Sequence, residues 1–112
     1  MTELIRNIEH AKDFKLTDLV EIEQGKVNSI SLSQTPGTKV TVFAIDAGEG
    51  LSTHAASGDA LVTVLEGTCE IDLEGAVHTL HAGDSLVMSA GAPHSVTGVT
   101  PFKMLLVVVR ES

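Results

Sequence analysis

Two histidines, His54 and His94, are the residues whose type and surroundings suggest chemistry. Each lies where a glycine-containing stretch adjoins a short apolar run: His54 within Gly48 to Gly67, and His94 after the turn Gly91-Ala92-Pro93. Imidazole nitrogens that share a site bind a divalent metal ion or hydrogen-bond a polar ligand. The sequence leaves two interpretations open: a pair of metal ligands, or two neutral histidines bonded to each other, to water or to a ligand.

Asp59 and Cys69 are the candidates for a third ligand. Asp59 ends the loop sequence Ser57-Gly58-Asp59, in which a carboxylate commonly accepts hydrogen bonds from backbone N–H groups. Cys69 alternates in phase with Ile71 and Leu73, which favours a buried cysteine that acts as a small hydrophobe. No basic residue stands near Cys69 in the sequence to lower its pKa, so we do not propose it as a nucleophile.

The remaining three histidines are weaker candidates. His78 and His81 are close together in an extended segment, but their spacing places them on opposite faces, which makes a shared metal site poor. We expect His81 at the surface, leave the role of His78 open and expect His10 to be solvated. The sequence contains neither the nucleophile elbow G-x-S-x-G nor a glycine-rich phosphate loop.

The elements that position these residues are predicted to be strands. Short apolar runs alternate with Gly or Pro turns, and no helical pattern of ten residues or more follows residue 16. Gly48 to Gly67 has the pattern of strand, loop, strand and turn. A short helix or turn is expected over 3–14. The other strands are expected at 19–22, 27–32, 39–46, 61–65, 68–73, 76–80, 85–88, 95–97 and 102–109. This pattern predicts an all-β sandwich or barrel.

The strand expected over 39–46 is apolar on both faces. Val40, Val42 and Ala44 share one face, whereas Thr41, Phe43 and Ile45 share the other. A strand buried on both faces indicates a sheet that lies between the barrel interior and another layer. A second subunit is one candidate for that layer.

Bulk properties exclude several classes of protein. A chain of 112 residues fits a single domain over 1–112. Its net charge of −8, with the acidic residues scattered, argues against a nucleic-acid partner, which would need clustered Lys and Arg. No stretch approaches the ~20 apolar residues of a membrane-spanning helix. Since one cysteine cannot form an intrachain disulfide, we expect a cytoplasmic protein.

The two glycine-histidine stretches resemble the paired motifs of the cupin superfamily. In the first motif, G-x5-H-x-H-x3,4-E-x6-G, the matching residues are Gly48, His54 and Gly67. Ala56 stands in place of the second histidine and Ala60 in place of the glutamate.

The second cupin motif, G-x5-P-x-G-x2-H-x3-N, is matched by Gly83, Gly91 and His94, while Ser89 replaces the proline and Gly98 the asparagine. The resemblance implies a double-stranded β-helix, the jelly-roll cupin barrel, with a conserved-barrel core at 39–109 and an N-terminal extension at 1–18 that packs on it. It also implies that His54 and His94 point inward, as ligands of a divalent ion such as Fe, Mn, Ni or Zn.

Replacing an imidazole and a carboxylate by Ala56 and Ala60 is expected to enlarge the barrel interior. The result would be a mostly apolar pocket with a polar end at the two histidines, suited to a small organic ligand. The alternative is a barrel packed solid by its own side chains. Parity and the resemblance predict the pocket residues Phe43, Ala56, Ala60, Val62, Val64, Met88, Val96 and Met104.

Three functions follow as hypotheses. The first is a small-molecule-binding cupin with a reduced metal site. The second is a metal-dependent enzyme of the dioxygenase, isomerase, decarboxylase or lyase type, which uses His54 and His94 on a small organic acid, sugar or aromatic compound. The third is a dimeric scaffold without a ligand. A homodimer is expected in each case, because cupins commonly pair sheet to sheet and the apolar strands at 39–46 and 102–109 need cover.

Overall fold

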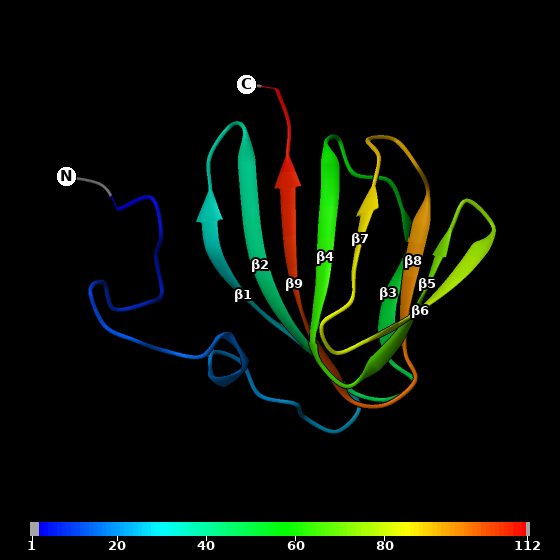
Figure 1. Ribbon diagram of the computed structural model, residues 1–112, viewed down its shortest axis with the longest axis horizontal. Coiled ribbons are helices and arrows are strands. Elements are labelled where there is room, and N and C mark those ends of the chain that lie inside the picture. The colour runs from blue at the N-terminus through cyan, green and yellow to red at the C-terminus, as the bar shows by residue number, and fades with distance from the viewer. Residues whose placement is uncertain (1–2, 112) are drawn as a thin grey trace.

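The computed structural model, which describes residues 3–111, consists of two antiparallel sheets that face each other (Figure 1). The five-stranded sheet contains, in spatial order, β1 (Val27–Gln34), β2 (Thr38–Ile45), β9 (Phe102–Val109), β4 (Asp59–Glu66) and β7 (Ser85–Met88). The four-stranded sheet contains β3 (Gly50–His54), β8 (His94–Gly98), β5 (Thr68–Leu73) and β6 (Ala76–His81). This arrangement confirms the predicted all-β jelly-roll barrel.

Alternation along the strands builds the core between the sheets. In β4, Ala60, Val62 and Val64 are buried, whereas Leu61 between them is exposed. The same two-residue period buries Cys69 and Ile71 of β5 on the opposite wall. Burial of each large aliphatic side chain stabilises the fold by ~1.5–3 kcal/mol, so the matched periods of the two walls hold the sheets together.

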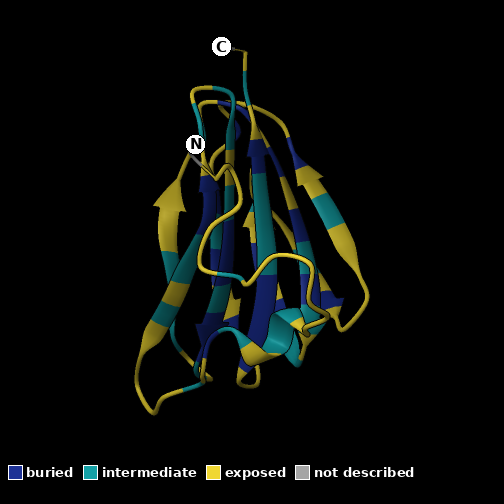
Figure 2. Ribbon diagram, turned by 90° about the vertical axis from the view of Figure 1, so that its left-hand side faces the viewer, coloured by how far each residue is buried: buried dark blue, intermediate teal, exposed yellow. Residues whose placement is uncertain are grey.

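The N-terminal segment, residues 3–26, precedes the first strand. It crosses the outer face of the five-stranded sheet, as Figure 2 shows from that side. It forms bends and turns followed by the short 3-10 turn η1 (Leu16–Asp18), and no helix forms over 3–14. Asn7 and Ala11 have positive φ angles of 66° and 61°, which interrupt helical geometry. The segment supplies the cover for the sheet: Ile8, Leu16, Leu19, Val20 and Ile22 pack with Leu32, Val42 and Ala44.

The strand predicted at 19–22 is wrong, because these residues adopt no strand. Val20 is buried against the outer face of the sheet instead of pairing with a sheet edge. The apolar run that suggested a strand is therefore explained by face packing. The other predicted strands are present, with bounds that differ by no more than two residues.

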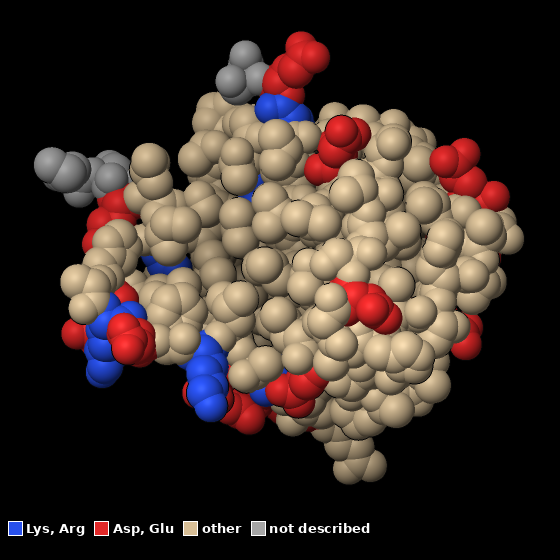
Figure 3. Space-filling model, in the orientation of Figure 1, with Lys and Arg blue, Asp and Glu red and all other residues tan. Residues whose placement is uncertain are grey.

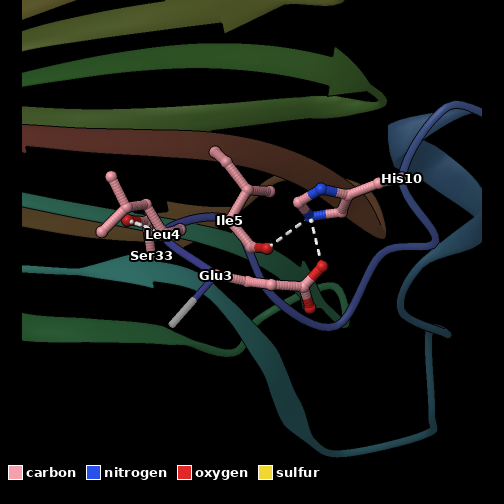
Figure 4. A network of polar contacts seen from close by, with 5 residues as sticks. All are labelled: Glu3, Leu4, Ile5, His10 and Ser33. Carbon is pink, nitrogen blue, oxygen red and sulfur yellow. Dashed lines mark hydrogen bonds and ion pairs between the residues drawn. The ribbon is translucent and has the colours of Figure 1, made fainter. Parts of the chain in front are cut away.

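The segment is also held by polar contacts (Figure 4 shows those near its start). The Ser33 hydroxyl donates a hydrogen bond to the Leu4 carbonyl at 2.7 Å. The exposed His10 ring donates to the Ile5 carbonyl at 2.7 Å and lies 3.4 Å from the Glu3 carboxylate. Further along, the Lys103 ammonium on β9 donates to the carbonyl of Thr17 at 2.6 Å.

Part of the outer face stays uncovered by this segment. Val107, Leu61 and Val87 are register partners across β9, β4 and β7, and we call them the outer row. Leu61 is 40% exposed and Val87 is 58% exposed. The N-terminal segment thus supplies the second layer over β2 around Val42 and Ala44. The outer row is the apolar part of this face that stays exposed.

Acidic residues outnumber basic ones by 15 to 7, which gives the chain a net charge of −8. Acidic side chains are spread over the face in Figure 3, and basic ones gather on the side of the N-terminal segment and near the C-terminus. Within the described part of the chain, no helix has the length and apolar character needed to cross a membrane. The cytoplasmic location stays a prediction.

Gly67, at the turn between β4 and β5, occupies a crowded left-handed position. Its φ is +78°, and a Cβ there would lie 2.2 Å from the Pro101 carbonyl oxygen and 2.8 Å from the Phe102 Cα. Gly75, between β5 and β6, has a similar φ of +87° but faces open space. Comparing an alanine substitution at each glycine therefore separates the cost of backbone strain from the cost of a steric clash.

We expect Gly67→Ala to lower the free energy of unfolding by about 2–5 kcal/mol, the sum of left-handed strain of about 1–2 kcal/mol and overpacking of about 1–3 kcal/mol. The matched control Gly75→Ala should lose only the strain, about 1–2 kcal/mol. Urea denaturation followed by circular dichroism measures both. Equal losses for the two variants would contradict the close packing of Gly67 against Pro101 and Phe102.

Candidate functional site

The two histidines of the motifs lie together at one end of the barrel. His54 ends β3 and His94 begins β8, and the two are register partners across the four-stranded sheet. Their ring centroids are 4.4 Å apart and the ring planes meet at 62°, an edge-to-face arrangement. His94 is only 4% exposed, whereas His54 is exposed. Residues forty positions apart in sequence thus form one polar pair.

Hydrogen bonds define which nitrogen of each ring is free. Nδ1 of His54 lies 2.8 Å from the Ser52 carbonyl, and Nδ1 of His94 lies 3.0 Å from the Ala92 carbonyl. A carbonyl oxygen only accepts, so each Nδ1 carries the proton. In the neutral rings each Nε2 is then left with a lone pair for a metal or for a ligand that donates a hydrogen bond.

A turn before β8 connects this pair to the loop after β3. Gly91 adopts φ +80°, and its N–H donates to the Ala56 carbonyl at 2.9 Å. The Asp59 carboxylate accepts a hydrogen bond from the Ala90 N–H at 2.9 Å. Asp59 therefore holds the turn through a backbone contact, which is the structural role that its sequence context favoured.

A hollow of about 280 Å³ opens beside the histidines, and we call it the barrel pocket. Three of the residues predicted to form a pocket, Phe43, Ala56 and Ala60, line it together with His54 and His94. Ala56 and Ala60 are the positions at which this chain lacks the imidazole and carboxylate of the family motif. The barrel pocket therefore lies at the two positions where alanine replaces the larger polar side chains of the family motif.

The other predicted pocket residues lie deeper and do not line the barrel pocket. Val62, Val64, Met88, Val96 and Met104 belong to the buried cluster between the sheets. Unbranched methionine side chains fill irregular space in such a core, and here they occupy the interior below the pocket. The barrel is thus packed through most of its length and hollow at the end that carries the histidines.

Six further residues line the barrel pocket without having been selected from the sequence: Lys39, Thr41, Ser57, Leu106, Val108 and Arg110. Four of them could have been found by parity. Lys39 and Thr41 alternate in phase with Phe43 on β2, and Leu106 and Val108 alternate in phase with Met104 on β9. For Ser57 and Arg110, which lie outside the strands, the sequence gives no comparable signal.

The remaining candidate ligands lie away from this pair. Cys69 is in the buried cluster, where burial raises the pKa of its thiol to about 11 and keeps it protonated at neutral pH. His78 and His81 are on β6, where the His81 ring contacts the Thr68 hydroxyl at 3.1 Å. Across residues 3–111, no group of three or more His, Cys, Asp or Glu side chains is placed to hold a metal ion.

The donor set at the site is accordingly two imidazole nitrogens. Resident catalytic metals in proteins use three or four protein ligands as a rule, so His54 and His94 alone form an incomplete set. The pair does not fit a tightly held metal of that kind. It fits a site in which the free Nε2 atoms face a ligand within the barrel pocket.

Comparison with known proteins agrees with this architecture. Residues 41–109 match the family model described as Cupin domain. No curated protein matches the chain. A conserved protein of unknown function from Streptococcus pyogenes is 41% identical, with a TM-score of 0.96 over 99% of this chain and 97% of that one.

Two further solved structures carry the same barrel. A cupin superfamily protein from Desulfitobacterium hafniense is 26% identical, with a TM-score of 0.91 over 96% of this chain and 98% of that one. A cupin 2 conserved barrel domain protein from Leptotrichia buccalis is 40% identical, with a TM-score of 0.84 over 87% of this chain. The match spans only 47% of the Leptotrichia chain.

Proposed function

Since this chain belongs to the cupin superfamily, we propose that it is a small-molecule-binding cupin with a reduced metal site, and that its ligand occupies the barrel pocket. The observation that carries the proposal is the hollow lined by Ala56 and Ala60 beside two histidines whose Nε2 atoms are free. In this function the histidines orient the ligand through hydrogen bonds.

The walls of the barrel pocket support an organic ligand. Phe43, Leu106 and Val108 form an apolar side, while His54 and His94 form a polar end. Binding sites for small molecules combine apolar walls with a few polar groups and commonly measure ~300–1,000 Å³. At about 280 Å³, the barrel pocket lies near the lower limit, which favours a small ligand.

A pocket-filling variant tests this proposal. Ala56→Leu should abolish binding, because the larger side chain occupies the hollow, whereas the neighbouring Ala55→Leu should bind normally because Ala55 is exposed and outside the lining. Binding is measured by titrating a panel of small organic acids, amides and sugars and following backbone amide resonances by NMR. If no compound shifts the resonances of pocket residues at millimolar concentration, the proposal fails and a barrel without a ligand is favoured.

A metal-dependent enzyme is the second candidate, and one observation favours it. Metal-bound histidines commonly donate a hydrogen bond from the N–H of the second ring nitrogen to a carbonyl, as Nδ1–H of both His54 and His94 does here. The ion would be Fe, Mn, Ni or Zn, held by the two Nε2 atoms with substrate or water as further ligands. Such an ion supplies Lewis acidity or a binding place for dioxygen. The reaction would be of the dioxygenase, isomerase, decarboxylase or lyase type.

Metal content decides between the two candidates. If the protein is the metal-dependent enzyme, untagged protein should hold near-stoichiometric metal after incubation with Fe, Mn, Ni or Zn. His54→Ala should lose this metal, because the exposed His54 ring is one of the two ligands. His81→Ala is the matched control and should keep the metal, because His81 lies on β6. Inductively coupled plasma mass spectrometry gives the content. Metal-free wild type under every condition would remove the enzyme candidate.

We also propose a homodimer that buries the outer row. Leu61 and Val87 are exposed on this sheet face, and burying them against a second copy would stabilise the dimer. Leu61→Glu should therefore convert the dimer to a monomer, whereas Val77→Glu should not, because Val77 is also apolar and is more exposed than Leu61 but lies on β6 outside the row. Light scattering at micromolar concentration measures the mass. A monomeric wild type would exclude the dimer.

A further inference from the structure

The barrel pocket carries positive charge in an otherwise acidic protein. The chain has 15 acidic and 7 basic residues. Two of the basic ones, Lys39 and Arg110, line the pocket, and no Asp or Glu is among its lining residues within the described part of the chain. A chance distribution of charge in such a chain would favour the opposite sign. The local excess of positive charge therefore points to a negatively charged ligand.

These two cations are also without carboxylate partners. Lys12, Lys26 and Lys103 each form an ion pair, with Glu9, Glu23 and Glu66. Within residues 3–111, neither Lys39 nor Arg110 forms one. Their charges thus remain available to a ligand.

Arg110 is held in place by its surroundings. Its backbone N–H donates to the Gly37 carbonyl at 2.9 Å, and its Nη1 donates to the Ser57 hydroxyl at 3.2 Å. Gly58 lets it approach closely, because a Cβ at that position would lie 2.8 Å from the Arg110 Cβ. A fixed guanidinium loses little freedom when it binds a planar anion.

One atom of Arg110 gives independent evidence of a missing partner. Its Nε is buried and finds no hydrogen-bond acceptor among the residues that the structure describes. A buried donor without an acceptor costs about 1–3 kcal/mol, and native proteins rarely tolerate one. A guanidinium can bind the two oxygens of a carboxylate through two parallel hydrogen bonds. Nε is shielded from solvent in the chain without a ligand, so an anionic ligand oxygen would supply the missing acceptor after a small rotation of the guanidinium toward the barrel pocket.

We propose that the ligand of the barrel pocket is a small carboxylate with an apolar body, held by Lys39 and Arg110. Phe43, Leu106 and Val108 contact the body. The free Nε2 atoms of the histidine pair accept hydrogen bonds from its far end or contact it directly. This inference rests on the proposed function, because it names the class of ligand for the same pocket.

The neighbouring acidic residues indicate on which side of Arg110 the carboxylate binds. A second hollow of about 460 Å³ shares Ser57 and Arg110 with the barrel pocket, but Asp59 and Glu111 line it. Their charges oppose an anion there, and one Asp59 oxygen already accepts the Ala90 N–H. The barrel side, with Lys39, is therefore the favourable side for the carboxylate.

Matched acid and amide pairs test the proposal on the full chain. Benzoate is compared with benzamide, and hexanoate with hexanamide, by NMR titration of wild type, Lys39→Gln and Arg110→Gln. Each acid should bind at least about tenfold more tightly than its amide, since a charged hydrogen bond contributes about 1.5 kcal/mol or more and 1.4 kcal/mol is tenfold. Each variant should reduce acid affinity by about tenfold and amide affinity by less, so that the preference for the acid over its amide falls.

Controls separate charge at the pocket from charge elsewhere. Lys15→Gln removes an exposed lysine outside the pocket lining and should leave acid binding unchanged. Arg110→Lys keeps the charge but loses the paired donors, so it should retain part of the acid preference. Thermal melts of each variant verify that the fold persists.

The outcomes distinguish this inference from the function on which it rests. Amides that bind as tightly as acids, or acid binding that Lys39→Gln and Arg110→Gln leave intact, would overturn the carboxylate and preserve the small-molecule pocket. If the acids and amides fail to shift pocket resonances at millimolar concentration while a sugar of the panel succeeds, only the carboxylate is overturned. Failure of every compound in the panel would overturn both proposals.

Discussion

The five-stranded sheet needs cover on both of its faces, and this requirement organises the molecule. Val40, Val42 and Ala44 of β2 point outward, while Phe43 and Ile45 point into the barrel. The inner face is covered by the four-stranded sheet, and much of the outer face by the N-terminal segment. Because the segment is fixed by apolar packing, it needs no regular secondary structure of its own.

The site lies where this packing ends. Below it, large aliphatic and methionine side chains fill the interior; at the open end, alanines and two histidines replace them. The loss of motif side chains has left space where a more complete site would hold polar ligating groups. The remaining polar groups are two imidazole nitrogens and two cations, and these suit recognition of a polar organic molecule.

The sequence predicted the barrel well because strand alternation and glycine turns are local signals. The match of Gly48, His54, Gly67, Gly91 and His94 to two motifs also anticipated the contact between the histidines. Three features were not accessible in this way. Residues 19–22 have strand-like composition but pack on a face, which depends on tertiary contacts.

The depth of the pocket and its charge were also hidden in the sequence. Whether Val62 or Met104 lines a cavity or fills it depends on how the two sheets close, which periodicity does not encode. Arg110 lies beyond the last strand, where alternation no longer assigns a direction. Its place beside Ser57 arises from the approach of two segments that are distant in the chain.

The position of β9 has a consequence for how the chain is made. β9, the last strand of the barrel in chain order, lies in the middle of the five-stranded sheet, between β2 and β4. Until residues 102–109 leave the ribosome, β2 and β4 lack the neighbour that joins them, and their edges are open to pairing with other chains. The complete barrel can therefore form only once residues 102–109 are available, and until then the open edges of β2 and β4 expose the chain to aggregation.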